Sequence, residues 1–176
     1  MPFSGTENNA SISSSRLHIK KLTVAGLLAG AGVLLSGIYI PVGPTKCFPF
    51  QHTINVLAGI LLGPWWGASI AFVTSFIRNM MGTGSLFAFP GSIPGVLMVG
   101  FAYRLFKKDW AALVEPLGTG PIGATLSALV IGSAIGKTPA LGALQFAFLA
   151  SSIPGALLGF ALVIMTKRMG ILKDLS

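Results

Sequence analysis

The side chains that could do chemistry are few, and they gather at the ends of long apolar segments. His52 and Asn55 stand three positions apart, so on a helix they share one face. Polar side chains within a membrane segment usually face a cavity or a partner. The polar candidates are Thr45, Lys46, Gln51, His52, Asn55, Arg78, Asn79, Gln145 and Ser151, and the phenylalanines expected near them are Phe48, Phe50, Phe87, Phe89, Phe146 and Phe148. Aromatic walls with a few convergent polar groups are typical of a small-molecule site.

Each candidate also has a simpler structural interpretation. His52 and Asn55 would serve equally well as hydrogen-bond partners between helices. Arg78 would anchor a helix end by extending its charged head toward water. Single phenylalanines more often belong to the core or face lipid.

Catalytic and metal-binding chemistry finds little support in the sequence. No Asp or Glu occurs between Ser11 and Lys107, and none between Glu115 and Asp174. We therefore expect no buried carboxylate of the kind that ion-driven carriers use. We expect no acid beside His52 for a catalytic triad and no zinc site. The sequence predicts a protein that is not an enzyme and holds neither cofactor nor metal.

The stretch from Gly132 to Thr138 imitates a phosphate-binding P-loop. That motif needs four residues between its first glycine and Gly-Lys-Ser/Thr, whereas Gly132 is followed by only three before Gly136. Energy from a nucleotide would therefore have to come from another subunit.

The composition predicts a chain built for lipid. Hydrophobic residues make up 53% of the sequence and charged residues only 9%, whereas soluble domains are about 25% charged. The formal net charge of +8 does not indicate nucleic-acid binding, because the basic residues flank apolar segments, where they orient helices. The single cysteine, Cys47, excludes an internal disulfide.

Continuous apolar runs predict an all-α membrane protein with six transmembrane helices. The expected spans are Leu22–Ile40, Phe48–Leu62, Trp65–Met81, Ser92–Phe106, Pro121–Ile135 and Gly142–Met165. With this arrangement most Lys and Arg residues lie on one side of the membrane, so both termini are expected in the cytoplasm. The protein is expected in the plasma membrane. We expect a disordered lead-in at 1–19, a membrane domain at 20–168 and a tail at 169–176.

Two stretches about sixty residues apart resemble each other. Gly63-Pro64 and Gly120-Pro121 begin the two copies, and Ser92–Gly95 and Ser152–Gly155 follow later in the same order. The pattern predicts a parallel hairpin repeat of spans three and four with spans five and six. The Ser-Ile-Pro-Gly elements are expected to break their helices beside a cavity.

Several longer segments resemble the ThiW family. They are the Ala25…Ala29 pattern, the segment from Pro41 to His52, the segment from Gly59 to Pro64 and the segment from Arg78 to Gly91. The resemblance covers roughly residues 20 to 167. ThiW proteins are substrate-binding (S) components of energy-coupling-factor (ECF) transporters, associated with the thiazole precursor of thiamine.

The resemblance implies a six-helix protein that binds hydroxyethylthiazole or a related precursor from outside the cell. It implies as partners a transmembrane coupling subunit, contacted through Ala25 and Ala29, and two ATPase subunits. The substrate-binding residues that it carries over are His52, Asn55, Arg78, Asn79, Phe87, Phe89, Gln145 and Ser151.

Two other classes of function stay open from the sequence. The first is a channel or carrier that works without partner subunits. The second is a membrane enzyme or assembly factor.

Overall fold

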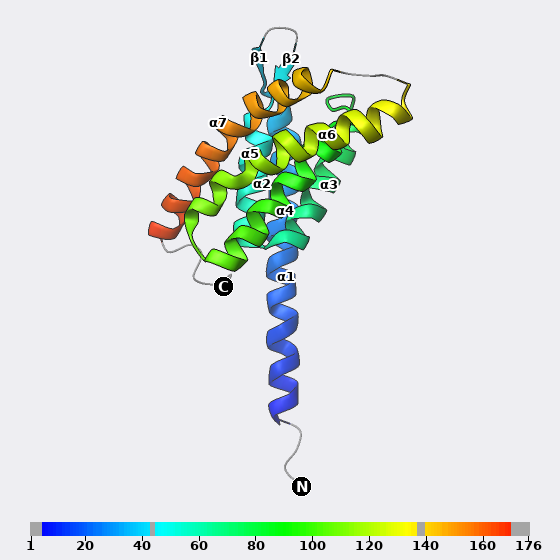
Figure 1. Cartoon of the computed structure of the whole chain (residues 1–176). Coiled ribbons are helices and arrows are strands. Elements are labelled where there is room, and N and C mark those ends of the chain that lie inside the picture. The colour runs from blue at the N-terminus through cyan, green and yellow to red at the C-terminus, as the bar shows by residue number, and fades with distance from the viewer. Residues whose placement is uncertain (1–4, 43–44, 137–139, 170–176) are drawn as a thin grey trace.

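The computed structural model describes residues 5–42, 45–136 and 140–169 as a bundle built mostly of helices. The first helix, α1 (Gly5–Leu34), ends in a 3₁₀ turn at Leu35–Gly37. Two short antiparallel strands follow, β1 (Ile40–Val42) and β2 (Thr45–Cys47), with Ile40 opposite Cys47. Figure 1 shows this hairpin at one end of the bundle, while the N-terminal half of α1 projects from the other.

The next two helices begin at prolines. In α2 (Pro49–Leu61) and α3 (Pro64–Met80) the proline occupies the first turn, where a helix needs no backbone N–H from it. Gly63 joins them with a φ of 88°, a conformation that glycine adopts without steric cost. A tight turn at Gly63-Pro64 thus connects α2 to α3.

The remaining helices are long. They are α4 (Ala88–Phe106), a helical stretch from Asp109 to Gly132, and α7 (Leu141–Arg168). The stretch starts as 3₁₀ helix at Asp109–Val114, continues through α5 (Glu115–Leu117) and α6 (Ala124–Leu126), and is π-helical at Gly118–Gly123 and Ser127–Gly132.

The helical character that the sequence predicts is confirmed, and four described segments are long and apolar enough to cross a membrane. These are Ser15–Gly37, Ala88–Phe106, Asp109–Gly132 and Leu141–Arg168. The other two expected spans correspond to α2, with 13 residues, and α3, with 17. At 1.5 Å per residue α2 is only about 20 Å long, well short of a hydrocarbon core about 30 Å thick. Six spans therefore stay a prediction.

Two boundaries differ from expectation. The fifth helical stretch begins at Asp109 and not at Pro121, so Glu115 lies inside the bundle. At the N-terminus α1 extends back to Gly5, within the expected lead-in. Residues 1–4 and 170–176 lie outside the described residues, and the proposed domain limits stay a prediction.

The expected helix breaks at the two Ser-Ile-Pro-Gly elements are wrong. Pro94 lies within the continuous helix α4, and Pro154 lies within α7. Bundled membrane helices tolerate proline because neighbouring groups compensate for the missing backbone bond. The first pair of repeat motifs also differs in position, since Pro64 starts a helix whereas Pro121 lies inside one. The hairpin repeat stays a prediction.

Helix α2 is the centre of the bundle, packed against α1, α3, α4 and α7. One side, with Ile54 and Ala58, packs in a core cluster with Ala25 and Val96. Another side, with Val56 and Ile60, packs in a cluster that includes Val163. A helix buried on every side must satisfy its polar side chains internally, so the polar residues of α2 need partners from the bundle.

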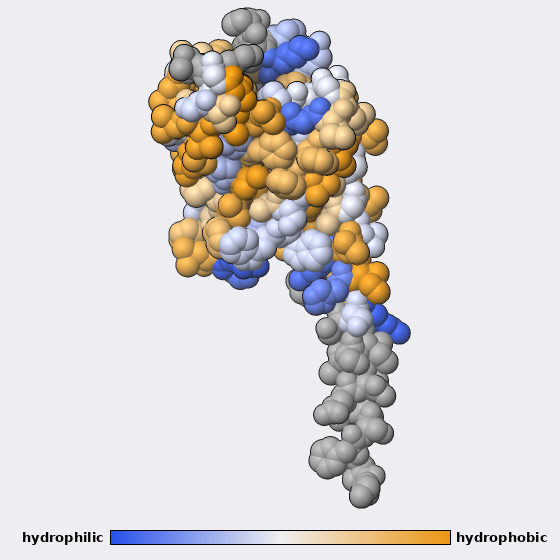
Figure 2. Space-filling view, turned by 90° about the vertical axis from the view of Figure 1, so that its right-hand side faces the viewer, coloured by the Kyte–Doolittle hydropathy of each residue, from blue (hydrophilic) through white to orange (hydrophobic). Residues whose placement is uncertain are grey.

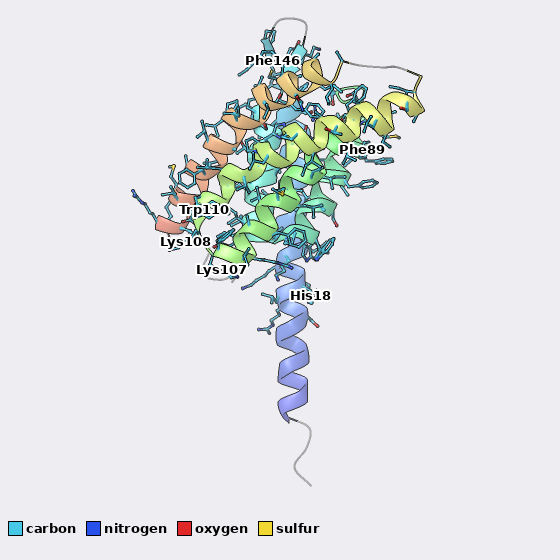
Figure 3. All side chains as sticks on the ribbon, in the orientation of Figure 1. His18, Phe89, Lys107, Lys108, Trp110 and Phe146 are labelled. Atoms are coloured by element: carbon cyan, nitrogen blue, oxygen red, sulfur yellow. The ribbon has the colours of Figure 1, made fainter. Side chains whose placement is uncertain are left out.

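Figure 2 shows one face of the molecule, on which hydrophobic residues predominate over the bundle and the most hydrophilic residues lie toward its two ends. Lys107 and Lys108 lie at the end away from the hairpin, on the same side as His18, while Phe146 lies near the hairpin (Figure 3). At the lysine end, Lys167 donates hydrogen bonds to the Tyr103 hydroxyl, at 3.1 Å, and to the Asp109 carboxylate. These bonds join the ends of α4 and α7 to the start of the Asp109–Gly132 stretch.

Candidate substrate-binding site

A cavity of about 480 Å³ opens at the hairpin end of the bundle. Its walls come from β2, the starts of α2 and α4, the end of α3 with the following loop, and the N-terminal half of α7. The residues that line it are Lys46, Phe48, Gln51, His52, Arg78, Gly82, Thr83, Gly84, Ser85, Phe87, Ala88, Gly91, Ser92, Leu144, Ala147, Phe148 and Ser151. Its size and mixed lining are those of a small-molecule pocket.

Four of the predicted binding residues line this cavity: His52, Arg78, Phe87 and Ser151. They come from α2, α3, the turn before α4, and α7, so residues a hundred positions apart meet at one site. Ser151 also accepts a hydrogen bond from the Phe48 backbone N–H at 3.2 Å, which ties α7 to the start of α2.

Aromatic side chains form part of the wall, as expected. Phe48, Phe87 and Phe148 line the cavity. The guanidinium carbon of Arg78 lies 4.6 Å from the centre of the Phe48 ring, within cation–π range. By contrast, Phe146 is 60% exposed on the outside of α7 and Phe89 packs on Phe72 at 5.4 Å between ring centres, so neither lines the cavity.

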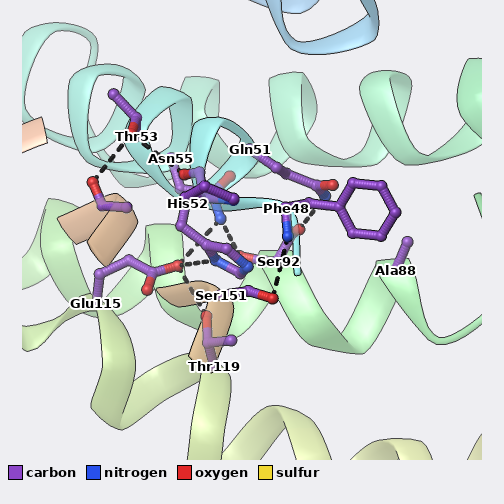
Figure 4. A network of polar contacts seen from close by, with 12 residues as sticks. Phe48, Gln51, His52, Thr53, Asn55, Ala88, Ser92, Glu115, Thr119 and Ser151 are labelled. Atoms are coloured by element: carbon purple, nitrogen blue, oxygen red, sulfur yellow. Dashed lines mark hydrogen bonds and ion pairs between the residues drawn. The ribbon is translucent and has the colours of Figure 1, made fainter. Parts of the chain in front are cut away.

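A polar network lies beside the cavity and centres on Glu115, which is fully buried. One carboxylate oxygen, Oε1, lies 2.8 Å from His52 Nδ1, and it accepts hydrogen bonds from Asn55 Nδ2 at 3.1 Å and Thr119 Oγ1 at 2.8 Å. Figure 4 shows the three groups converging on this oxygen. The second oxygen, Oε2, has no hydrogen-bond partner in the described part of the chain.

The sequence-based expectation of no buried carboxylate is therefore wrong. A lone buried carboxylate is costly, but hydrogen bonds to its charged form reduce that cost. Glu115 obtains these bonds from two helices, because His52 and Asn55 share a face of α2 while Thr119 lies one turn after Glu115. We also expected no acid beside His52, and the argument against a catalytic triad rested on that expectation. It is wrong, because Glu115 lies beside His52.

His52 links the buried network to the cavity. It lines the cavity, whereas Glu115 does not. When Nδ1 carries a hydrogen it donates to Glu115, which leaves Nε2 as the second polar atom of the ring. Glu115 thereby fixes the orientation of the imidazole that a bound molecule meets.

A second polar pair fixes the wall between α2 and α4. Gln51 Nε2 donates a hydrogen bond to Ser92 Oγ, and the Ser92 carbonyl accepts one from Asn55 at 3.4 Å. Gln51 and Ser92 both line the cavity. Asn55 is 3% exposed and contributes from behind the wall.

The other predicted binding residues lie away from the cavity. Asn79 donates to the backbone carbonyls of Ser75 and Ser85 at 2.8 and 3.0 Å, so it fastens the end of α3 to the loop that follows. Gln145 lies in the first turns of α7 and is not among the residues that line the cavity.

The predicted partner-binding residues lie on the inner side of α1. Ala25 is 7% exposed within the core cluster, and Ala29 is partly buried against that cluster. Gly26 and Gly30 of α1 have open space around them, since a Cβ added at either would have nothing within 4 Å. Contact between Ala25, Ala29 and a coupling subunit stays a prediction.

Sequence reasoning missed Glu115 and Thr119, and it gave Ser92 no binding role. Glu115 follows the charged residues Lys107, Lys108 and Asp109 closely, so it looks like part of a loop. The available signal was its spacing of four from Thr119 in an otherwise apolar stretch, which places both on one helix face. Within the described ranges, no group of three or more His, Cys, Asp or Glu side chains is arranged to hold a metal ion.

Comparison with known proteins gives the family. The profile described as "Thiamine-precursor transporter protein (ThiW)" matches residues 22–169, which is most of the chain. The chain belongs to the ThiW family. The resemblance noted from the sequence is thus confirmed, and the family implies a membrane transporter of a thiamine precursor. No curated protein matches the chain significantly.

Proposed function

We propose that this protein is the substrate-binding component of an ECF transporter and that it takes up the thiazole precursor of thiamine, hydroxyethylthiazole. The observation that carries the proposal is the cavity, with phenylalanines in its wall and His52 held in place by Glu115. A flat heteroaromatic ring suits such walls. A ring nitrogen or a hydroxyl group suits the free edge of an oriented imidazole and the neighbouring Ser151 and Gln51.

In this proposal the chain spans the membrane six times with both termini in the cytoplasm. Its substrate enters from outside, and a coupling subunit with two ATPases supplies the energy. The position of the cavity supports this, because it lies at the end of the bundle opposite Lys107 and Lys108, and lysines favour the cytoplasmic side.

Titration of the purified protein with hydroxyethylthiazole, thiamine and the pyrimidine precursor tests the substrate. We expect saturable binding of the thiazole and weaker binding of the other two. If none of the three binds saturably, the substrate assignment is wrong.

A carrier that works without partners is a second candidate, and Glu115 favours it. Ion-coupled carriers use buried ionisable groups, and Glu115 is fully buried, with one oxygen that no described residue hydrogen-bonds. Uptake into proteoliposomes decides between the two. The ECF proposal predicts accumulation only when the coupling subunit, both ATPases and ATP are present; accumulation by this chain alone under an ion gradient would establish the carrier.

A further inference from the structure

The cavity wall carries positive charge without a matching acid. Arg78 and Lys46 both line the cavity, and no Asp or Glu is found among the described residues that do so. Glu115 lies behind the wall, and its hydrogen bonds go to His52, Asn55 and Thr119, not to Arg78.

The guanidinium of Arg78 makes few hydrogen bonds for a buried cation. Arg78 is only 2% exposed, and within the described ranges its side chain donates a single hydrogen bond, from Nη2 to the Thr83 carbonyl at 3.3 Å. Its Nε is buried and has no hydrogen-bond partner among the residues that the structure describes, and the guanidinium lies over the ring of Phe48. A guanidinium has five N–H donors and pairs best with planar or tetrahedral oxyanions.

The helices around the cavity add to this positive potential. The residues before the first turns of α2 and α4, Phe48 and Phe87, both line the cavity, so two helix N-termini meet there. Neither first turn contains an acidic residue, and neither helix has a side-chain cap. The N-terminal end of a helix attracts anions through its macrodipole.

We propose that the site selects a thiazole precursor that carries an anionic phosphate ester over the neutral alcohol. The anion pairs with Arg78 and Lys46, and the ring lies deeper, toward His52 and Phe148. This inference rests on the proposed function, since it concerns the form of the same substrate.

The experiment compares the affinities of purified protein for hydroxyethylthiazole and for its phosphate ester. The wild-type protein should bind the ester about tenfold more tightly, as expected for a new hydrogen bond between charged groups. In Lys46→Gln and Arg78→Gln this ratio of affinities, measured within each variant, should fall toward one. Lys107→Gln removes the same charge at the far end of the bundle and should leave the ratio unchanged.

The outcomes separate this inference from the proposed function. If the neutral alcohol binds and the ester binds equally or more weakly, the anion preference is wrong and the proposed function stands. If neither binds, the proposed function falls as well. Competition by inorganic phosphate at the same concentration as the ester would reveal a simple anion site and overturn the inference.

Arg78→Gln removes a buried side chain that also bonds to the loop after α3, and its fold is therefore checked by thermal unfolding. Lys46 is exposed, so its replacement should not disturb the fold. If Arg78→Gln does not fold, the test of the proposal rests on Lys46→Gln. An ester-to-alcohol ratio in Lys46→Gln equal to that of the wild type would contradict the proposal.

Discussion

Glu115 and His52 matter most at the scale of single residues, because they bring an ionisable pair into the apolar centre of the bundle. Three hydrogen-bonding groups converge on one oxygen of Glu115, at 2.8 to 3.1 Å. Binding in the cavity therefore depends on more than His52. The orientation of the His52 imidazole depends on Glu115, which does not line the cavity.

We predict that Glu115→Gln weakens binding of the precursor by about tenfold and lowers the free energy of unfolding by about 1–3 kcal/mol. The amide keeps the shape of the side chain but replaces the carboxyl group on which His52, Asn55 and Thr119 converge. Calorimetric titration and thermal unfolding measure the two effects.

Asp109→Asn is the matched control for Glu115→Gln, because Asp109 is an acid of the same helical stretch and lies at the lysine end of the bundle. It should leave the affinity unchanged. An affinity in Glu115→Gln equal to that of the wild type would show that Glu115 does not position His52.

The sequence allows part of the site to be predicted. His52, Arg78 and Ser151 stand out as polar side chains in apolar segments, and all three line the cavity. Asn79 stands out for the same reason, yet it bonds to local backbone carbonyls instead. The sequence alone cannot tell a polar side chain that lines a cavity from one that hydrogen-bonds to a nearby backbone carbonyl, because both stand out in the same way within an apolar segment.

At the scale of elements, the contact between α2 and α7 sets the position of His52. A Cβ added to Gly155 would clash with the Pro49 carbonyl and lie 2.6 Å from the His52 Cβ. A Cβ added to Gly159 would lie 2.7 Å from the Val56 Cβ. The two helices are this close because glycines of α7 face α2.

We predict that Gly155→Ala destabilises the protein by about 1–3 kcal/mol, the usual cost of overpacking. It should also weaken substrate binding, because the added methyl group pushes against His52. Gly142→Ala is the control on the same helix, since a Cβ there has nothing within 4 Å.

Thermal unfolding in detergent and ligand titration measure both glycine variants. Equal unfolding temperatures for Gly155→Ala and Gly142→Ala would contradict the close packing of α2 on α7.

The apolar runs correctly indicate where helices occur, but they do not give all of the boundaries. The fifth stretch starts at Asp109, and Ala112 within it packs in the core cluster that includes Ala156 and Val163 of α7. The short strands β1 and β2 were not predicted, since three residues each carry too little pattern. Pro94 and Pro154 look like helix breakers in sequence, and tertiary packing overrides that local preference.

At the scale of the whole molecule, the two ends of the bundle differ. The cavity and the β1–β2 hairpin lie at one end, and Lys107, Lys108 and Lys167 lie toward the other (Figures 1 and 3). The proposed orientation places the cavity outside the cell and the lysines in the cytoplasm.

Cysteine labelling of intact cells tests this orientation in a background with Cys47→Ser. Ser85 is exposed and lines the cavity, and Lys107 is exposed at the far end. We predict that a membrane-impermeant maleimide labels Ser85→Cys and leaves Lys107→Cys unlabelled until the cells are opened. The reverse pattern would place the cavity on the cytoplasmic side.

The central claim is that the cavity at the hairpin end holds the thiamine precursor, and filling the cavity tests it most directly. Ala147 lines the cavity on α7, whereas Ala161 lies exposed on the same helix and does not line it. Equilibrium binding of labelled hydroxyethylthiazole is compared in Ala147→Trp and Ala161→Trp. We predict that saturable binding is lost in Ala147→Trp and kept in Ala161→Trp; equal binding by two folded variants would show that the precursor binds elsewhere.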